Sequence, residues 1–364
     1  MGTVVSATSE GQTGANVEPR RWRLVVRVSA AALVFLLPVC VGIVVLSRPE
    51  VRYRRALARI ENAGGTVDYG WRRNEKVVVR VVFCDGIRNS DVLADLPQLP
   101  CLEMLFFRGE SLDDRGLTHI AQVTSLKSLQ AIGASITDEG LMHLTKLPNL
   151  ERLDLSGAKV TTEGIPHLAG IPGLRQLSLS DTNLDDRATE SLARMTHLEV
   201  LELGRTRTTD KGIAVLAKAR TAGARSTPDG AASETALTLL RSLDLSDTVV
   251  GDEGVLLLTA FPAINYLDLS RTRITGKAVQ TLGTLPNLQH LQVNGTSLNA
   301  ASLDPLRGLR QLQTLGVRGC EISETEARAF VKLSKGLEVW FGGDGADDFS
   351  GECLRNEPDG DEGE

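Results

Sequence analysis

A hydrophobic motif that recurs at a fixed spacing constrains this chain more than any other feature of its sequence. The motif is L-x-x-L-x-L, in which another aliphatic residue can replace any of the three leucines. Successive motifs start 24 residues apart, except for one step of 42 residues and a last step of 25. The motif starts are Val78, Leu102, Leu126, Leu150, Leu174, Leu198, Leu240, Ile264, Leu288, Leu312 and Leu337. Such a period predicts a solenoid in which each unit buries its apolar face against its neighbours.

Each unit has the pattern of a strand followed by a short helix. In the unit LERLDLSGAKVTTEGIPHLAGIPG, Leu153 and Leu155 alternate at period two, as the inward residues of a strand do. Ile165, Leu168 and Ile171 follow three residues apart, which predicts one face of a helix or 3₁₀ segment. The eleventh residue after each motif start is of a type that caps a helix N-terminus. These residues are Asn89, Asp113, Thr137, Thr161, Asp185, Thr209, Gly251, Thr275, Asn299 and Ser323.

The eighth residue after the start is a small polar residue in the later units, and it could bond the turning backbone of its own unit and its neighbour. These residues are Thr182, Thr206, Thr248, Thr272, Thr296 and Cys320. The strings LDLSGAKVTTEGI, LSLSDTNLDDRATESL, LDLSDTVVGDEGV and LDLSRTRITGKAV resemble the leucine-rich-repeat family over residues 78–343. With threonine or cysteine where many members have asparagine, they resemble F-box-associated repeats and bacterial membrane-anchored leucine-rich-repeat proteins.

This resemblance implies an α/β solenoid, or horseshoe, with parallel strands on the concave face and short helices on the convex face. Residues 1–77 contain no F-box-like segment, so a role as a ubiquitin-ligase adaptor is not implied. The proteins of the bacterial group resemble this chain in an amino-terminal anchor as well. We therefore expect a single transmembrane helix before the repeats.

An uncharged segment of 19 residues, 28–46, follows a polar amino-terminal tail, residues 1–27, that we expect to be disordered. At ~1.5 Å per residue a helix of this length spans about 28 Å, close to the hydrocarbon core of a bilayer. A cleaved signal peptide is the alternative, but its apolar region is normally shorter and followed by a small-x-small site. The segment predicts a single-pass membrane protein. Four arginines precede it and five follow it, a small excess that favours a cytoplasmic repeat domain.

The remaining ranges complete the expected domain organisation. Residues 47–65 form a basic juxtamembrane stalk, whose arginines either touch anionic headgroups or are only solvated. The repeat domain covers 66–343, begins with a hairpin cap at 66–83, and contains a polar insertion loop at about 220–236. That insertion is either a contact element or a variation in length. Residues 344–364 hold nine acids against one arginine, and predict a disordered acidic tail.

Composition excludes several classes of function. The net charge is −6 and outside the tail the chain is nearly neutral, so no basic field predicts nucleic-acid binding. The five cysteines have no metal-ligand spacing. His119, His143 and His167 recur 24 residues apart, too far apart in neighbouring units to share one zinc ion. We predict no catalytic, cofactor or metal site, and we expect that the chain is not an enzyme.

We expect the chain to bind an unknown protein partner through the concave face of the solenoid. The motif residues that do not point inward must point to solvent on the open face of the sheet. In the central units these candidates are Arg152, Asp154, Arg175, Glu199, Glu202, Arg241, Asp244, Tyr266, Asp268, His290 and Gln292. A structural envelope protein whose repeats self-associate is the alternative function. A weaker alternative is an enzyme or metal protein that uses the convex histidine column.

Overall fold

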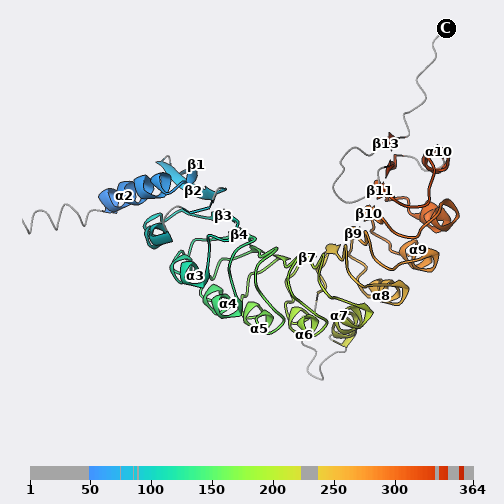
Figure 1. Cartoon of the computed structure of the whole chain (residues 1–364), viewed down its shortest axis with the longest axis horizontal. Coiled ribbons are helices and arrows are strands. Elements are labelled where there is room, and N and C mark those ends of the chain that lie inside the picture. The colour runs from blue at the N-terminus through green and yellow to red at the C-terminus, as the bar shows by residue number, and fades with distance from the viewer. Residues whose placement is uncertain are drawn as a thin grey trace, which may run out of the picture. The chain divides into compact units, whose positions relative to one another are not determined.

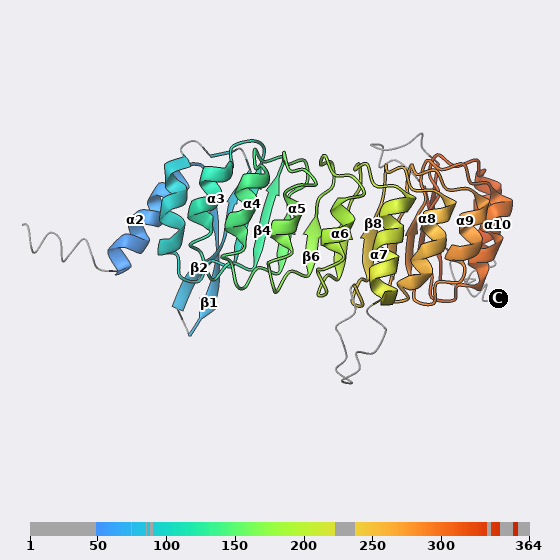
Figure 2. The same ribbon diagram turned by 90° about the horizontal axis from the view of Figure 1, so that it is seen from below.

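The computed structural model describes residues 49–73, 75–84, 86–87, 90–222, 237–332, 336–342 and 352–355. The chain divides into two units, Met1–Val51 and Arg52–Glu364, and the repeats lie in the second. In that unit one sheet lines the concave side, and the helices cover its outer side (Figure 1). Figure 2 shows the helices side by side along this convex surface.

All strands belong to one sheet, in which they follow one another in chain order. They are β1 (Thr66–Arg72), β2 (Glu75–Phe83), β3 (Met104–Arg108), β4 (Ser128–Ile132), β5 (Arg152–Asp154), β6 (Gln176–Ser178), β7 (Val200–Glu202), β8 (Ser242–Asp244), β9 (Tyr266–Asp268), β10 (His290–Gln292), β11 (Thr314–Gly316), β12 (Glu338–Phe341) and β13 (Glu352–Arg355). Strands β2 to β12 are parallel, whereas β1 and β13 each join one end of the sheet antiparallel.

A helix follows most strands. The helices are α2 (Pro49–Asn62), η1 (Ser90–Gln98), α3 (Asp114–Ile120), α4 (Asp138–Leu144), α5 (Ile165–Leu168), α6 (Ala188–Leu192), α7 (Asp210–Ala222), α8 (Asp252–Leu257), η2 (Leu258–Ala260), α9 (Gly276–Leu282), η3 (Ala300–Gly308) and α10 (Glu324–Lys332). The strand-helix alternation that the period predicts is therefore present. The α/β solenoid with parallel strands is confirmed.

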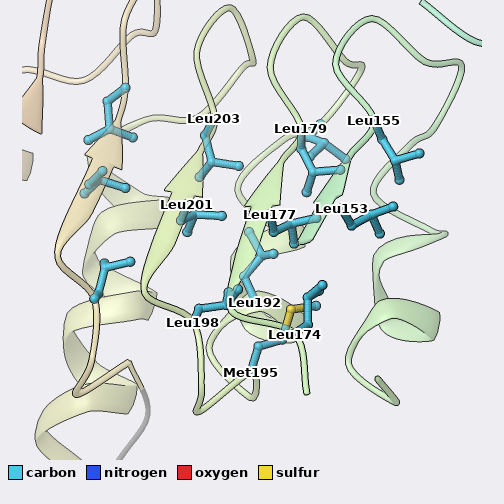
Figure 3. Packing of buried hydrophobic residues seen from close by; sticks show 14 of the residues in the cluster. Leu153, Leu155, Leu174, Leu177, Leu179, Leu192, Met195, Leu198, Leu201 and Leu203 are labelled. Carbon is cyan, nitrogen blue, oxygen red and sulfur yellow. The ribbon is translucent and has the colours of Figure 1, made fainter. Parts of the chain in front are cut away.

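Leucines from successive strands form the core. Leu153 of β5 pairs in register with Leu177 of β6, and Leu177 pairs with Leu201 of β7. All three side chains are buried, as are the motif leucines before and after them (Figure 3). Each three-residue strand buries its central leucine, and stacking of neighbouring units must supply the rest of the core.

The threonine column bonds the turn of its own unit. The hydroxyl of Thr206 donates to the carbonyl of Leu203 at 2.6 Å, and Thr248, Thr272 and Thr296 make the equivalent bond at the same distance. Cys320 instead bonds a neighbouring unit, because its Sγ lies 3.2 Å from the carbonyl oxygen of Val293. These buried hydroxyls therefore have partners, as burial requires.

An aspartate clamp joins neighbouring units at five places among the described residues, and the sequence analysis did not anticipate it. In the clearest case, Asp138 Oδ1 accepts from the backbone N–H of Thr161 at 2.8 Å. Its Oδ2 accepts from the hydroxyl of Thr161 at 2.6 Å. The clamp aspartates are Asp114, Asp138, Asp186, Asp210 and Asp252. Their partners are Thr137, Thr161, Thr209, Gly251 and Thr275.

The clamp changes the expected capping of the helices. Asp113, Thr275 and Asn299 do cap their own helices through the side chain, as predicted. Thr137 occupies the cap position but makes no such bond, and its hydroxyl donates to the clamp carboxylate of Asp114. Helix α5 has Gly164 as its N-cap, three residues later than expected. The expectation of one capping residue per helix is therefore correct only in part.

The expected insertion and acidic tail lie mostly outside the described residues. Residues 220–222 are the end of α7, so the start of the insertion continues a helix. Beyond it, β7 and β8 pair in register and Asp210 clamps Gly251 at 2.7 Å, so the stack continues. In the tail range, Glu352–Arg355 is strand β13, which pairs with β12, rather than disordered chain. The apolar Leu354 packs partly buried against the core, which accounts for this difference.

The prediction of a transmembrane helix requires correction. Residues 28–46, like 1–27, lie outside the described residues. Among the helices that the structure describes, none is long and apolar enough to cross a bilayer. The longest of them, α2, has 14 residues, about 21 Å, and carries four arginines. On this finding for the described residues, the predictions of a transmembrane helix and of a single-pass membrane protein are wrong.

Candidate functional site

The open face of the sheet carries a row of polar side chains, which we call the lane. Its members, at the fourth residue after each motif start, are Asp154, Ser178, Glu202, Asp244, Asp268 and Gln292. Strand pairing sets each of them directly beside the next. Neighbouring strands lie ~4.8 Å apart. Four carboxylates are therefore concentrated within six adjacent strands of one surface.

Serines two residues further along the chain orient three of these carboxylates. The backbone N–H of Ser156 donates to Asp154 Oδ1 at 2.9 Å. Ser246 and Ser270 donate in the same way to Asp244 and Asp268, both at 2.8 Å. The sequence analysis missed this role of serine, although the recurrent string L-D-L-S signals it. These bonds hold each of the three carboxylates in place.

Burial raises the pKa of three side chains on this face. Burial, with smaller effects of Asp244 and Asp247, raises the pKa of Asp268 to about 6. Burial and the charges of Asp244 and Asp154 also raise the pKa of Glu202. Burial first, and then the nearby carboxylates, raises the pKa of Tyr266 to about 12. A bound cation would reverse the unfavourable contribution of these charges.

Among the described residues, no arginine or lysine forms an ion pair with a lane carboxylate. Two acids beside the lane are paired. Arg175 Nη1 lies 2.6 Å from Glu199 Oε1, and Arg271 Nε lies 3.0 Å from Asp247 Oδ1. The lane carboxylates therefore lack the cationic partners that these two neighbouring acids have.

The other predicted site residues flank the lane. Arg152 begins β5 and lines, with Asp154 and Glu202, a shallow hollow of about 140 Å³. Arg175, Glu199 and Arg241 each precede a strand by one residue. This arrangement places Arg152, but not the paired Arg175, on the surface of the hollow.

Aromatic and amide side chains occupy the carboxyl-terminal part of the same face. The rings of Tyr266 and His290 lie 6.3 Å apart. His290 Nδ1 is 2.9 Å from the hydroxyl of Thr314. Gln292 Oε1 accepts from the side-chain amide of Asn294 at 3.0 Å. The strands thus arrange the predicted residues on one face, with acids towards one part and neutral hydrogen-bonding groups towards the other.

The histidine column lies on the opposite, convex side. His119, His143 and His167 occupy the last turns of α3, α4 and α5. Within the part of the chain that the structure describes, no three histidine, cysteine, aspartate or glutamate side chains are grouped to hold a metal ion.

Comparison with known families decides what kind of repeat this is. A family model described as "Leucine Rich repeat" matches residues 146–168 and 236–258, each of which contains a motif start, a strand and the turn after it. The units are leucine-rich repeats. The subtype expected from the threonine and cysteine column stays a prediction. A search of curated proteins finds no match.

Solved structures of other leucine-rich-repeat proteins are similar at low identity. One is a leucine-rich-repeat protein of Leptospira interrogans, 19% identical with a TM-score of 0.44, over 67% of this chain and 56% of that one. This chain thus spans little more than half the length of that protein. An internalin of Listeria monocytogenes, inlF, is 17% identical with a TM-score of 0.44, over 76% of this chain and 91% of its own. A second internalin, inlC2, is 22% identical with a TM-score of 0.44, over 61% and 82%.

Proposed function

We propose that this leucine-rich-repeat protein is a binding module that holds a protein partner on the concave face of its sheet. Leucine-rich repeats commonly mediate protein–protein interaction, and they are typically not enzymes. The candidate contact residues are the lane and its flanking side chains. The partner that fits this surface is an extended segment rich in lysine or arginine, because the lane presents carboxylates without cations of their own.

The observation that carries this proposal is the half-buried, unpaired state of the lane carboxylates. Charges that serve only for solubility are normally well exposed, where they keep ordinary pKa values. Here burial raises the pKa of Asp268 to about 6, so the ionised side chain lowers stability at neutral pH. Destabilising charged groups are retained in a sequence where they serve a function, because residues that support activity often reduce stability. Lysine or arginine side chains of a partner would relieve the repulsion among them.

Binding to an array of extended peptides that differ only in net charge tests the proposal. Cationic peptides should bind, with affinity that falls as salt rises, because Coulombic attraction is screened. The triple variant Glu202→Gln, Asp244→Asn and Asp268→Asn should remain folded and lose this binding.

The matched control removes three exposed carboxylates from convex helices, through Glu139→Gln, Glu190→Gln and Glu253→Gln. The change in net charge equals that of the lane variant. Equal loss in both variants would mean that total charge, not the lane, attracts the peptide. Unchanged binding in the lane variant would show that the concave-face proposal is wrong.

A further inference from the structure

The sheet ends at β1, whose outer edge is unoccupied by any other described strand. The β1–β2 hairpin extends beyond the helices and the other strands of its unit (Figure 2). A free edge presents backbone N–H and C=O groups that can pair with another chain, and proteins usually protect such edges with lysine, proline or a covering element. The strand β1, TVDYGWR, contains neither lysine nor proline. This edge is therefore open to strand pairing.

Exposed aromatic side chains make the same strand an interaction surface. Trp71 is 75% exposed and Tyr69 is 41% exposed. The two residues are two positions apart, so their side chains lie on one face of the strand. Lys76 of the adjacent β2 places its ammonium group 4.3 Å from the centre of the Tyr69 ring. Large aromatics are favoured at interfaces because they bury much area with few rotatable bonds.

The charges on β1 are complementary to those of a second, antiparallel β1. We propose that β1 pairs with β1 of a second copy of this chain, with the two Gly70 residues facing each other on the two-fold axis. In this register Asp68 lies opposite Arg72 of the second copy, and Tyr69 lies opposite its Trp71. Symmetry doubles both contacts. Opposite charges and aromatic pairs are the cross-strand combinations that stabilise a sheet.

Neighbouring registers are less favourable. A two-fold axis at Asp68 sets two carboxylates against each other, and an axis at Arg72 sets two guanidinium groups against each other. An axis at Tyr69 places Asp68 opposite Gly70, and an axis at Trp71 places Arg72 opposite Gly70, so neither register forms the ion pairs between Asp68 and Arg72. The sequence of β1 thus selects the Gly70-centred register, and an isologous contact of this kind closes at a dimer.

Existing contacts leave both charged residues able to take part. Asp68 pairs with Arg80 at 3.4 Å, and its side chain is 61% exposed. Arg72 pairs with Glu103, and its side chain is 54% exposed. Exposed pairs of this kind contribute little on their own. The charges of the second copy would therefore extend them into a network rather than break a buried interaction.

Sedimentation velocity of the purified full chain over a concentration series measures the pairing. Wild-type protein should shift from monomer to dimer and stop there. Asp68→Arg or Arg72→Asp alone should raise the dimer dissociation constant about tenfold. Each substitution gives positions 68 and 72 the same charge, and these positions face each other twice across the two-fold axis. The double variant, Asp68→Arg with Arg72→Asp, restores opposite charges in the reverse order and should recover the dimer.

Two controls make the test specific. Trp71→Ser should weaken the dimer without changing the circular dichroism spectrum, since its side chain is exposed. Glu253→Arg, a charge reversal on α8 of the convex face, should leave the dissociation constant unchanged. A monomer at every concentration, growth beyond a dimer, single reversals without effect, or a double variant weaker than either single one would each overturn the proposal.

Discussion

The aspartate clamp makes a sharp prediction for Asp138→Ala. This substitution removes the acceptor for both the backbone N–H and the hydroxyl of Thr161, at 2.8 and 2.6 Å. A hydrogen bond to a charged group contributes about 1.5–3 kcal/mol, and the two bonds share one carboxylate, so they are not additive. We expect Asp138→Ala to lower the free energy of unfolding by about 2–4 kcal/mol.

The adjacent Glu139 supplies the matched control. It lies in the same first turn of α4 and is exposed, so it complements the helix dipole much as Asp138 does. Glu139→Ala removes this electrostatic effect without removing the clamp. It should cost less than about 0.5 kcal/mol. Urea unfolding followed by circular dichroism compares the two variants at one pH.

Gly164 gives a second, independent check of the clamp. A Cβ at this position would lie 2.3 Å from Asp138 Oδ1, so Gly164→Ala requires the clamping carboxylate to shift. In the Asp138→Ala background that conflict is absent, and Gly164→Ala should then cost clearly less than it does alone. Strict additivity of the two substitutions, or equal costs for Asp138→Ala and Glu139→Ala, would refute this account of the clamp.

Three further predictions follow from the described contacts. Leu153→Asp should lower the free energy of unfolding by several kcal/mol, because it buries an unpaired carboxylate. Arg152→Ala, on the open face of the same strand, should lower it by less than about 0.5 kcal/mol. Equal shifts in melting temperature for the two variants would contradict the strand register. Thr206→Val removes the 2.6 Å bond to a buried carbonyl and should cost about 1–3 kcal/mol in urea unfolding. Since the folded-state pKa of Asp268 is raised from 3.8 to about 6, wild-type stability should fall as pH rises through this window. Asp268→Asn should therefore stabilise the protein by roughly 1–3 kcal/mol at neutral pH and have little effect below the window, as unfolding midpoints across pH would measure.

The repeat, its register and its core were predictable because they depend on leucine spacing. A solenoid packs each unit only against its neighbours, so a motif such as that of Leu153 specifies both the strand and the side that it buries. The clamp was not predictable by the same means. An acid in the first turn of a helix fits the dipole of that helix, and nothing local shows that Asp138 bonds Thr161, 23 residues later. The recurrent glycine at Gly140, Gly164, Gly212 and Gly254 was the available signal, since the clamping carboxylate occupies the space of its Cβ.

The expected transmembrane helix was based on the hydropathy of 28–46 and on the resemblance to anchored bacterial proteins. The hydropathy argument considers only the length and composition of 28–46, and no described helix supports it. The lane residues were placed correctly on one face by alternation, because a strand has only two faces. Their burial and pKa were beyond sequence reasoning, since both depend on the neighbouring strands rather than on the motif itself.

Two kinds of aspartate recur along the solenoid, and their contacts separate structure from candidate function. The clamp aspartate Asp138 uses both carboxylate oxygens on one threonine of the next unit, so its replacement should reduce stability. The lane aspartate Asp268 accepts the backbone N–H of Ser270, lies beside other carboxylates, and forms no ion pair with a described cation. Its replacement by asparagine should increase stability. Stability and peptide-binding measurements together can thus separate the two kinds, because the lane aspartate Asp268 combines a stabilising substitution with a loss of peptide binding.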